Sequence, residues 1–466
     1  MKKKHLNLFY LTCVISGVFG SISAHAQDPI TGIVGKNQWL FYKPELSAAA
    51  DSAATDTSLG LIQKFNKVLA ANGIELAVVM APLKMRIYAE HLPDTLKLND
   101  YMKGNYDRMQ QLLSSNKVNV VDVNTAFLNS PKRDSDTPLY FRLDTHWSPT
   151  GAMVAAEAIK VAIDGNPSLK KSLDSIPEEK YKITINKRKR PSKGRDLVPV
   201  VPPNSPAFEP ELLGQVNIDR VAPAKEDLLG NRQSGGLALL GSSYSMDWTG
   251  FSDALRYVLQ RDIVSMGVPA DQGSWVGMET YLQDDSFQIK APKILLWEMP
   301  ERDMRAPPDL KYRPARYISD NSEWLLRASA WIQNSCKPSK VQAKITSAGL
   351  ATNPAALKGA NIATGPTNEG DFIEISFDNP VEKLDYISAR TLVAGSKTVT
   401  LEASGPGVAM RRFTLTVAGD DIAHALKSPL PSNGRGFNKV RIFPGKTNGF
   451  LFENVQVCRQ PEDLLS

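Results

Sequence analysis

The segment Leu237–Ser245, LALLGSSYS, places four apolar residues directly before a glycine and a serine-rich turn. The apolar run predicts a buried strand, and a helix is expected to follow over about 251–265. A serine just past a strand lies at the carboxyl edge of a parallel sheet, where open α/β folds place their functional sites. Gly241 permits a sharp turn, and backbone N–H groups after it can face a developing oxyanion. Ser243 is therefore a candidate nucleophile, although a turn or N-cap serine is the commoner role of such a residue.

Helices and strands alternate on both sides of this segment. Apolar residues at helical spacing predict a helix over 59–72 before a strand at 74–81, and a second helix over 101–115 leads into a strand at 118–123. Another apolar strand is expected at 294–297. This alternation predicts an α/β layered fold with a mainly parallel sheet.

The first 26 residues have the pattern of a bacterial secretory signal peptide. Lys2–Lys4 precede the apolar run Leu6–Ile22, and Ala24-His25-Ala26 forms an A-x-A cleavage site. A membrane anchor is the alternative, but the run is short for a bilayer span and contains Ser and Gly. We therefore expect a mature chain, 27–466, that is exported and does not span the membrane. Its 52 basic and 49 acidic residues argue against nucleic acid as a partner.

The periodicity changes in the last third of the chain. The 466 residues, 42% hydrophobic and 22% charged, are enough for two to three globular domains. After about residue 325, some seven short alternating segments are separated by turns, which predicts an antiparallel β-sandwich over 326–466 behind an α/β domain over 27–325. Cys336 and Cys458 are expected to form a disulfide in an oxidising compartment, with two buried thiols as the alternative.

Residues 165–235 differ from both regions because they are rich in Pro, Lys and Arg. We expect a long irregular excursion from the sheet. The basic run Lys187–Arg195 is either a solvated loop or a cationic rim that attracts an anionic polymer.

A second polar cluster, DTHWSPTG at Asp144–Gly151, is expected in a loop before a helix over 152–162. A serine hydroxyl needs a base to become a nucleophile, and imidazole is suited to this near neutral pH. A carboxylate can fix the tautomer of that imidazole, and Asp144 can meet His146 if the backbone turns between them. The other mature histidines, His91 and His424, lack a D-x-H context. Three histidines and one cystine leave no zinc-ligand pattern, and we predict no metal or other cofactor.

The two polar clusters, in this order, carry a family resemblance. The block RLDTHWSPTGA at Arg142–Ala152 resembles the D-x-H-W block of the periplasmic alginate O-acetyltransferases, the AlgX and AlgJ proteins, and Gly241–Ser245 is similar to their serine block. Gly35–Phe41 (GKNQWLF) and Trp297–Arg302 (WEMPER) match as well. The resemblance covers about residues 30–310. It implies an SGNH-hydrolase-like domain with a permuted sheet, because D-x-H precedes the serine.

The resemblance also implies roles for the site residues. Ser243 would be the nucleophile, His146 the base and Asp144 the carboxylate that orients it. The C-terminal sandwich is similar to the carbohydrate-binding module that AlgX carries and AlgJ lacks.

Substrate contacts are less well defined by the sequence. Trp147 is a candidate sugar platform, or else a core residue that braces the loop. Arg302 is a candidate partner for a uronate carboxylate, or else part of a salt bridge to Glu298 or Asp303. Cations after the first strand and in the sandwich are weaker candidates, with surface roles as the alternative: Lys84, Arg86, Arg411, Arg412, Lys439 and Arg441.

The family resemblance implies a periplasmic enzyme that moves acetyl groups, through an acetyl-serine, onto hydroxyls of an exopolysaccharide. Alginate, a polyuronate, is the leading acceptor. Because acetyl-CoA is not expected outside the cytoplasm, a membrane-linked acyltransferase is the expected donor partner, with an export complex as another candidate partner. An acetylesterase of the same fold, an inert polysaccharide-binding or secretion scaffold, and a different acceptor such as cellulose stay open.

Overall fold

The computed structural model describes residues 30–221, 236–311, 314–349, 356–358, 361–430 and 436–466. The predicted signal peptide, 1–26, lies outside these ranges. Within them, no helix has both the length and the apolar character needed to span a membrane.

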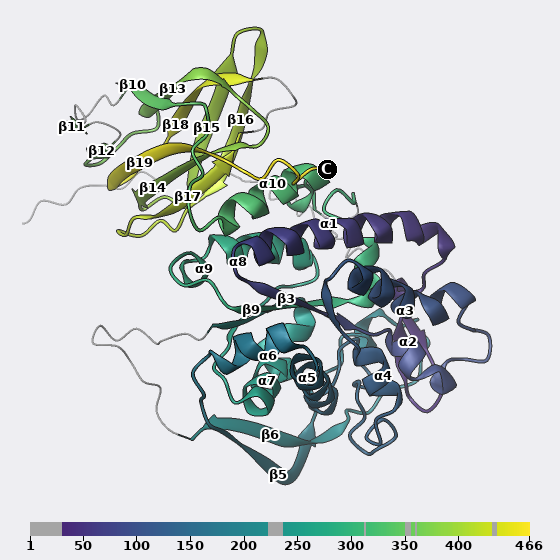
Figure 1. Ribbon diagram of the computed structural model, residues 1–466. Helices are drawn as coiled ribbons and strands as arrows, with labels where there is room; N and C mark the ends of the chain where they lie inside the picture. Colours follow the sequence, from purple (N-terminus) through teal and green to yellow (C-terminus); the bar gives the residue numbers. More distant parts are fainter. Residues whose placement is uncertain (1–29, 222–235, 312–313, 350–355, 359–360, 431–435) are drawn as a thin grey trace, which may run out of the picture.

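A five-stranded parallel sheet forms the centre of the first part of the chain (Figure 1). Its order is β4-β3-β9-β7-β8, and every neighbouring pair is parallel. The carboxyl ends of the strands therefore share one edge, and the segments after β3, β7 and β9 meet there. The strands are β3 (Glu75–Ala81), β4 (Asn119–Val121), β7 (Leu237–Gly241), β8 (Val264–Gly267) and β9 (Ile294–Pro300).

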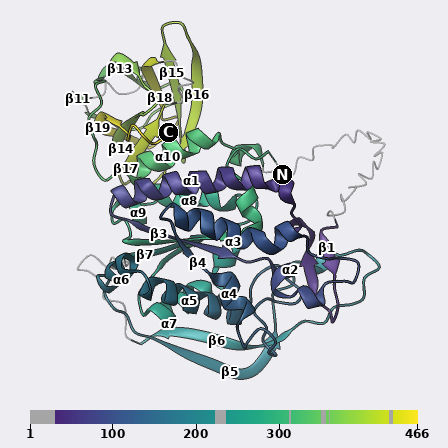
Figure 2. The same cartoon turned by 45° about the vertical axis from the view of Figure 1, so that its right-hand side comes forward.

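Helices cover both faces of this sheet, which confirms the α/β prediction (Figure 1 and Figure 2). The short α2 (Lys84–Ile87) follows β3 at the carboxyl edge. One face is covered by α4 (Val123–Leu128), α5 (Pro149–Asp164), α6 (Pro167–Asp174) and α7 (Phe251–Leu259). The other is covered by α1 (Ser52–Ala71), α3 (Asp100–Ser115), α8 (Gly273–Gln283), α9 (Asp285–Gln288) and α10 (Asn321–Ile332).

The helix expected over 251–265 is shorter than predicted. Helix α7 ends at Leu259, because Gln260 adopts a left-handed conformation with φ of 50°. The chain then forms β8, which pairs with β7 as the edge strand of the sheet. The prediction was wrong here because β8 is a short edge strand whose four residues are all only partly buried.

The prediction of an irregular excursion over 165–235 was also wrong in part. Helix α6 is followed by a two-stranded antiparallel ribbon of β5 (Tyr181–Pro191) and β6 (Leu212–Arg220). Alternating apolar residues hold its register, with Ile183 opposite Ile218 and Ile185 opposite Val216. The first half of the basic run, Lys187–Arg190, occupies the end of β5, and Lys193 and Arg195 follow the strand. Residues 222–235 lie outside the described ranges.

Two antiparallel five-stranded sheets form the C-terminal part, as predicted. Their orders are β10-β13-β18-β15-β16 and β11-β12-β19-β14-β17, and a shared apolar core lies between them. The alternating sequence pattern did not predict short strands such as β17. The strands are β10 (Ala343–Gly349), β11 (Ala356–Lys358), β12 (Asn361–Thr364), β13 (Phe372–Val381), β14 (Asp385–Ala394), β15 (Thr398–Gly405), β16 (Val408–Thr416), β17 (His424–Pro429), β18 (Phe437–Phe443) and β19 (Gly449–Arg459).

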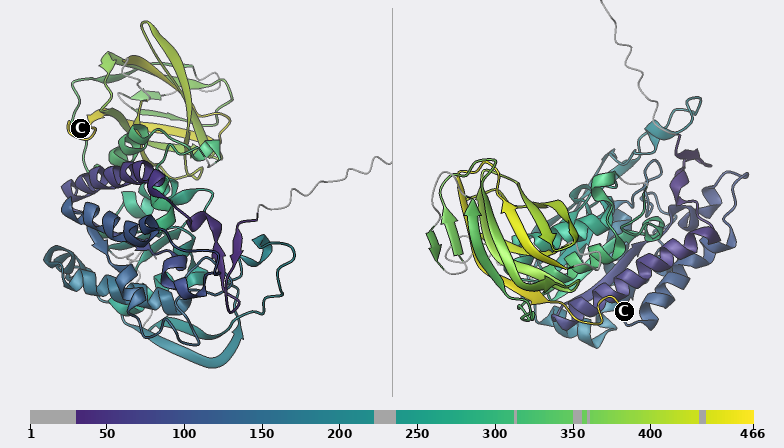
Figure 3. Two further views of the ribbon diagram at one scale, coloured as in Figure 1. Left: turned by 90° about the vertical axis from the view of Figure 1, so that its right-hand side faces the viewer. Right: turned by 90° about the horizontal axis from the view of Figure 1, so that it is seen from above.

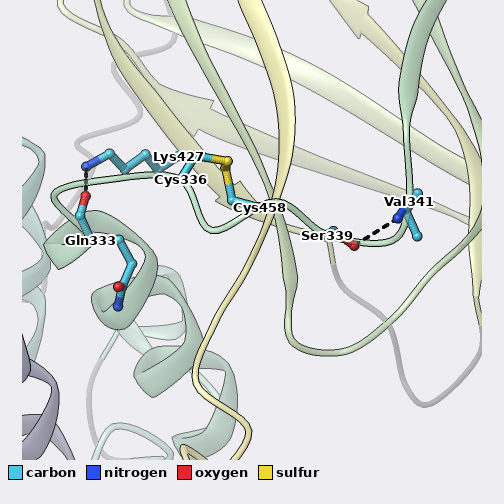
Figure 4. Close-up of a disulfide and its surroundings, with 6 residues drawn as sticks. All are labelled: Gln333, Cys336, Ser339, Val341, Lys427 and Cys458. Carbon is cyan, nitrogen blue, oxygen red and sulfur yellow. Dashed lines mark hydrogen bonds between the residues drawn. A yellow bond between two sulfur atoms is a disulfide. The ribbon is translucent and has the colours of Figure 1, made fainter.

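The sandwich sits at one end of the α/β layers (Figure 3), and α10 lies between the two parts. The boundary predicted near residue 325 falls inside α10, where Trp324 and Leu325 are buried in the α/β core. At the other end of the helix, Lys427 of β17 donates a hydrogen bond to the Trp331 carbonyl at 3.1 Å. It donates another to the Gln333 carbonyl at 2.8 Å (Figure 4).

The predicted disulfide is present. Cys336, just after α10, is bonded to Cys458 on β19, with a Cα–Cα distance of 5.1 Å and a sequence separation of 122 residues (Figure 4). The disulfide thereby links a strand of the sandwich to the segment directly after α10, the helix between the two parts of the chain.

Removal of this disulfide is expected to lower stability. The double variant C336S/C458S should lose about 2–4 kcal/mol of unfolding free energy, because the unfolded chain regains the entropy of a long open loop. Chemical denaturation of the variant and of the oxidised protein measures this difference. Reduction of the wild-type protein should reproduce it, and equal unfolding midpoints for all three samples would contradict it.

Candidate active site

Ser243 lies directly after β7, at the carboxyl edge of the parallel sheet. It begins a short 3-10 helix, Ser243–Ser245, and the Ser242 hydroxyl caps that turn by accepting the Tyr244 N–H at 3.2 Å. Gly241 precedes the turn, and a Cβ there would collide with the Ser245 hydroxyl and the Glu298 carboxylate. Glycine is therefore required by this close approach.

The loop that carries Asp144 and His146 is closed by an isolated bridge and is followed by a capped helix. Tyr140 pairs with Trp147 across the loop. Ser148 then caps α5, because its hydroxyl accepts the N–H groups of Thr150 and Gly151 at 3.1 and 3.3 Å. Both ends of the loop are fixed, so the two side chains between them are held in place.

The structure brings Asp144, His146 and Ser243 together. His146 Nε2 lies 2.7 Å from Ser243 Oγ, and His146 Nδ1 lies 2.6 Å from Asp144 Oδ1. With the Nδ1 proton donated to Asp144, Nε2 is left as the acceptor for the serine hydroxyl. Asp144 and His146 are buried, at 2% and 7% exposure. This arrangement can remove a proton from Ser243 and return it.

The surroundings of Asp144 keep it ionised. Burial alone would raise the pKa of its carboxyl, but the hydrogen bonds and charge of His146, together with the Asp196 N–H, lower the pKa below its usual value. Oδ1 also accepts the His146 N–H at 3.0 Å, and Oδ2 accepts the Asp196 N–H at 2.8 Å. The anionic form is the one that can orient an imidazole.

Asp196 is a neighbour of this site that the sequence did not indicate. Its carboxylate accepts the Thr145 N–H at 2.8 Å and the Thr145 hydroxyl at 2.5 Å, and Oδ2 lies 3.5 Å from His146 Nδ1. Burial and the charge of Asp144 raise the pKa of Asp196. In the described part of the chain, Asp144, His146 and Asp196 form the one acidic–histidine group with metal-ligand spacing, but His146 Nδ1 is hydrogen-bonded to Asp144.

Lys84 supports the backbone of the loop that carries Asp144 and His146. The sequence suggested a surface residue, but its side chain is fully buried at the start of α2. Its Nζ donates to the carbonyls of Leu40, Arg142 and Asp144 at 2.6, 3.0 and 2.8 Å. Burial lowers the pKa of Lys84 to about 8. The lysine thus ties β2 (Leu40–Tyr42) of the N-terminal β1–β2 hairpin (β1, Gly32–Val34) to the backbone of the Asp144 loop.

Glu298, near the end of β9, holds the serine turn. It is fully buried and accepts the Ser242 N–H, the Ser242 hydroxyl and the Ser245 hydroxyl at 2.8, 2.9 and 3.0 Å. Burial raises the pKa of Glu298 to about 7, against the opposing effect of these hydrogen bonds. The strand-end run WEMPER therefore contributes a support for the turn that contains Ser243.

The raised pKa of Glu298 predicts a pH dependence of stability. Between the ordinary value of 4.5 and about 7, the folded protein binds this proton more tightly than the unfolded chain. The unfolding free energy should therefore fall as pH rises through this window, by about 2–3 kcal/mol from pH 5 to pH 8 for this group. Denaturation at both pH values, with wild type and E298Q, isolates its share. Identical pH profiles of the two proteins would contradict the assignment.

Trp147 is not a sugar platform, which corrects that prediction. Its side chain is fully buried and packs against Phe127, Tyr244 and Phe251, and its Nε1–H donates to the Tyr244 carbonyl at 3.1 Å. The alternative role holds: Trp147 braces the loop against the turn that carries Ser243.

Arg302 lies behind the site. Its side chain is 11% exposed, and its guanidinium lies 5.4 Å from the ring centres of Tyr42 and Tyr244. Nη1 donates to the Tyr244 hydroxyl at 3.1 Å, and that hydroxyl donates to the Thr145 carbonyl. Nε lies 3.8 Å from Asp303. These contacts favour a supporting role, and contact with a uronate stays a prediction.

The remaining candidates occupy other parts of the molecule. Arg86 is buried in an ion pair with Glu301. His91 stacks on Trp39 with ring centres 4.9 Å apart, and His424 of β17 bonds to Asp285 and Asp420. In the sandwich, Arg411 is exposed on β16, while Arg412, Lys439 and Arg441 lie near the carboxylates of Glu402 or Glu374.

The parallel sheet, the serine after β7 and the Asp–His loop define the class: a protein with an SGNH-hydrolase-like α/β domain. A family model described as the SGNH hydrolase-like domain of the acetyltransferase AlgX matches residues 33–301. The chain belongs to this acetyltransferase family.

Similar proteins agree with this assignment. A probable alginate O-acetylase AlgJ of Azotobacter vinelandii is 31% identical over 304 residues, which cover 62% of this chain and 73% of that protein. The O-acetyltransferase domain of Pseudomonas putida AlgJ superposes with a TM-score of 0.51 at 25% identity, covering 62% of this chain and 96% of that one. Pseudomonas aeruginosa AlgX shares the fold over 92% of this chain and 95% of that one, with a TM-score of 0.60 at 17% identity.

Proposed function

We propose that this protein is a periplasmic polysaccharide O-acetyltransferase that works through an acetyl-serine on Ser243, with alginate as the acceptor. The observation that carries the proposal is the hydrogen-bonded series from Asp144 through His146 to Ser243 at the carboxyl edge of the sheet. The Azotobacter vinelandii relative is named a probable alginate O-acetylase, which supports the choice of acceptor, and the Pseudomonas putida AlgJ domain is named an O-acetyltransferase domain.

In the first half-reaction, Ser243 Oγ attacks the carbonyl carbon of an acetyl donor while His146 Nε2 takes its proton. Collapse of the tetrahedral intermediate breaks the donor ester, and the leaving group receives the proton from His146. Asp144 stabilises the imidazolium between these transfers.

The oxyanion of that intermediate needs hydrogen-bond donors. In the turn at 242–246, the N–H groups of Ser242, Tyr244, Ser245 and Met246 already have acceptors. Among the described residues, none accepts a hydrogen bond from the Ser243 N–H. We assign it as one oxyanion donor.

In the second half-reaction, a sugar hydroxyl gives its proton to His146 and attacks the acetyl carbon. Collapse releases the acetylated sugar and returns the proton to Ser243. The donor is expected to reach the site from a membrane-linked acyltransferase, with an export complex as a further partner.

The sandwich has a face suited to an anionic sugar. Arg441 lies 4.9 Å from the ring centre of Phe372, and Arg412 lies 5.9 Å from that of Phe443. Arg412 and Arg441 both stand opposite Glu402 in the sheet, so the two guanidinium groups share one face. We assign this face to carbohydrate binding.

A transfer assay tests the proposal. The purified protein is given an acetyl ester with a coloured leaving group, with and without polymannuronate, and acetyl on the polymer is measured. Acetylated polymer supports the transferase. Ester cleavage without acetylated polymer favours an acetylesterase, and inertness of the protein toward the ester favours a scaffold.

A further inference from the structure

Trp248 stands exposed beside the site. Of the seven tryptophans in the chain, six are buried, while Trp248 is 43% exposed. Its ring centre lies 4.8 Å from that of His146, with the rings nearly perpendicular at 77°. It comes five residues after Ser243, in the 3-10 helix Asp247–Thr249. A large apolar surface is thus exposed to solvent next to Ser243 and His146. The folded protein forgoes the free energy that burial of this surface would give.

The position of Trp248 is fixed by its neighbours. The Thr249 hydroxyl is within hydrogen-bond distance of the carbonyls of Tyr244 and Met246, at 2.8 Å each, and Thr249 is fully buried. Gly250 ends the turn in a left-handed conformation with φ of 75°. The indole is therefore presented by a rigid element and not by a loose loop.

A second, buried aromatic residue supports Trp248 from the protein side. Phe141 stacks on Trp248 with ring centres 6.3 Å apart and planes within 24°, and it is only 4% exposed. Gly194 approaches the Phe141 ring so closely that a Cβ would collide with it. The Asp196 loop thus supports Phe141, and Phe141 supports the indole.

We propose that Trp248 is the platform on which a pyranose ring of the acceptor stacks, so that one of its hydroxyls faces acetylated Ser243. This inference rests on the proposed function and names the acceptor subsite. Aromatic rings bind the C–H faces of sugars as they bind other apolar surfaces. A β-linked mannuronate ring in its chair form has one face with only C–H groups. A guluronate ring has axial oxygens on both faces, so it stacks less well at equal charge.

The alternative role for Trp248 is to brace His146. Ester cleavage and transfer to sugar, measured separately, distinguish this role from that of a platform. Cleavage of a small acetyl ester in water needs His146 but no sugar. In the W248A variant, ester cleavage should stay within about threefold of wild type, while kcat/KM for a mannuronate oligomer falls about tenfold or more through KM. W248F should keep most of the transfer. Unchanged transfer in W248A, or equal loss of cleavage and transfer, overturns the inference.

A footprinting measurement decides the subsite independently of transfer. Trp248 in the S243A variant is oxidised by a tryptophan-selective reagent, and its peptide is quantified by mass spectrometry. A mannuronate oligomer should lower oxidation of Trp248 several-fold, and a guluronate oligomer of equal length should lower it less. If wild type transfers nothing to sugar, the proposed function fails, yet protection still supports the platform. Equal oxidation with and without the mannuronate oligomer overturns the platform in either case.

Discussion

Ser243→Ala is expected to lower acetyl-ester cleavage by about a thousandfold or more, because the nucleophile is lost while the fold is kept. The Ser243 hydroxyl is 2.7 Å from His146 Nε2, so its loss removes the one attacking group that the imidazole serves. His146→Ala should have an effect of similar size. The double variant should be no worse than either single variant by more than a few-fold, because residues that act as a unit are not additive.

A matched control separates loss of the nucleophile from general damage. Ser274 is a buried serine of α8, on the face of the sheet covered by α1, and its hydroxyl has no hydrogen-bond partner among the described residues. Ser274→Ala should cleave the ester at the wild-type rate. Full ester cleavage by Ser243→Ala would remove Ser243 from the mechanism.

Lys84→Met is expected to lower the unfolding free energy by about 3–5 kcal/mol. The substitution keeps the volume of the side chain but leaves three buried carbonyls, of Leu40, Arg142 and Asp144, without their donor. It also removes a cation that lies 5.2 Å from the ring centre of Trp39. Ester cleavage should fall as well, because the backbone of Asp144 is released.

The control for this variant is Lys170→Met. Lys170 forms an exposed i,i+4 pair with Asp174 on α6, and such pairs contribute about 0.5 kcal/mol or less. Both variants are compared with wild type by chemical denaturation at one pH. A stability loss of less than about 1 kcal/mol in Lys84→Met would show that the three carbonyls find other partners.

Long periodic elements could be predicted from the sequence, because burial of one face leaves a regular pattern. The helix expected over 59–72 is part of α1, and the strand expected at 74–81 is β3. The pattern failed where little is buried, as in β8 and in the exposed ribbon of β5 and β6. There the Pro and Lys content outweighed a weak alternation.

Two local motifs predicted the residues that meet at the site, Asp144, His146 and Ser243. The residues that hold these three in place could not be predicted. Lys84 follows β3 and Glu298 lies near the end of β9, so both reach the site because the parallel strands end at one edge, whereas Asp196 comes from the segment between β5 and β6. Lys84 looked like a surface residue, since burial of a lysine needs three carbonyls that no local sequence shows. The burial of Trp147 could not be predicted for the same reason, because it depends on packing against Phe127 and Phe251, which come from other helices.

The acetyl-serine mechanism predicts that one acetyl group can be followed through Ser243. The protein is mixed with the acetyl ester, quenched, digested and examined by mass spectrometry, and a parallel sample receives mannuronate oligomer before quenching. We predict acetyl on the peptide that contains Ser243 in the first sample, and its loss from that peptide with matching gain on the sugar in the second. Acetylated sugar without any acetyl on Ser243, or acetyl that leaves Ser243 only to water, would contradict transfer through an acetyl-serine.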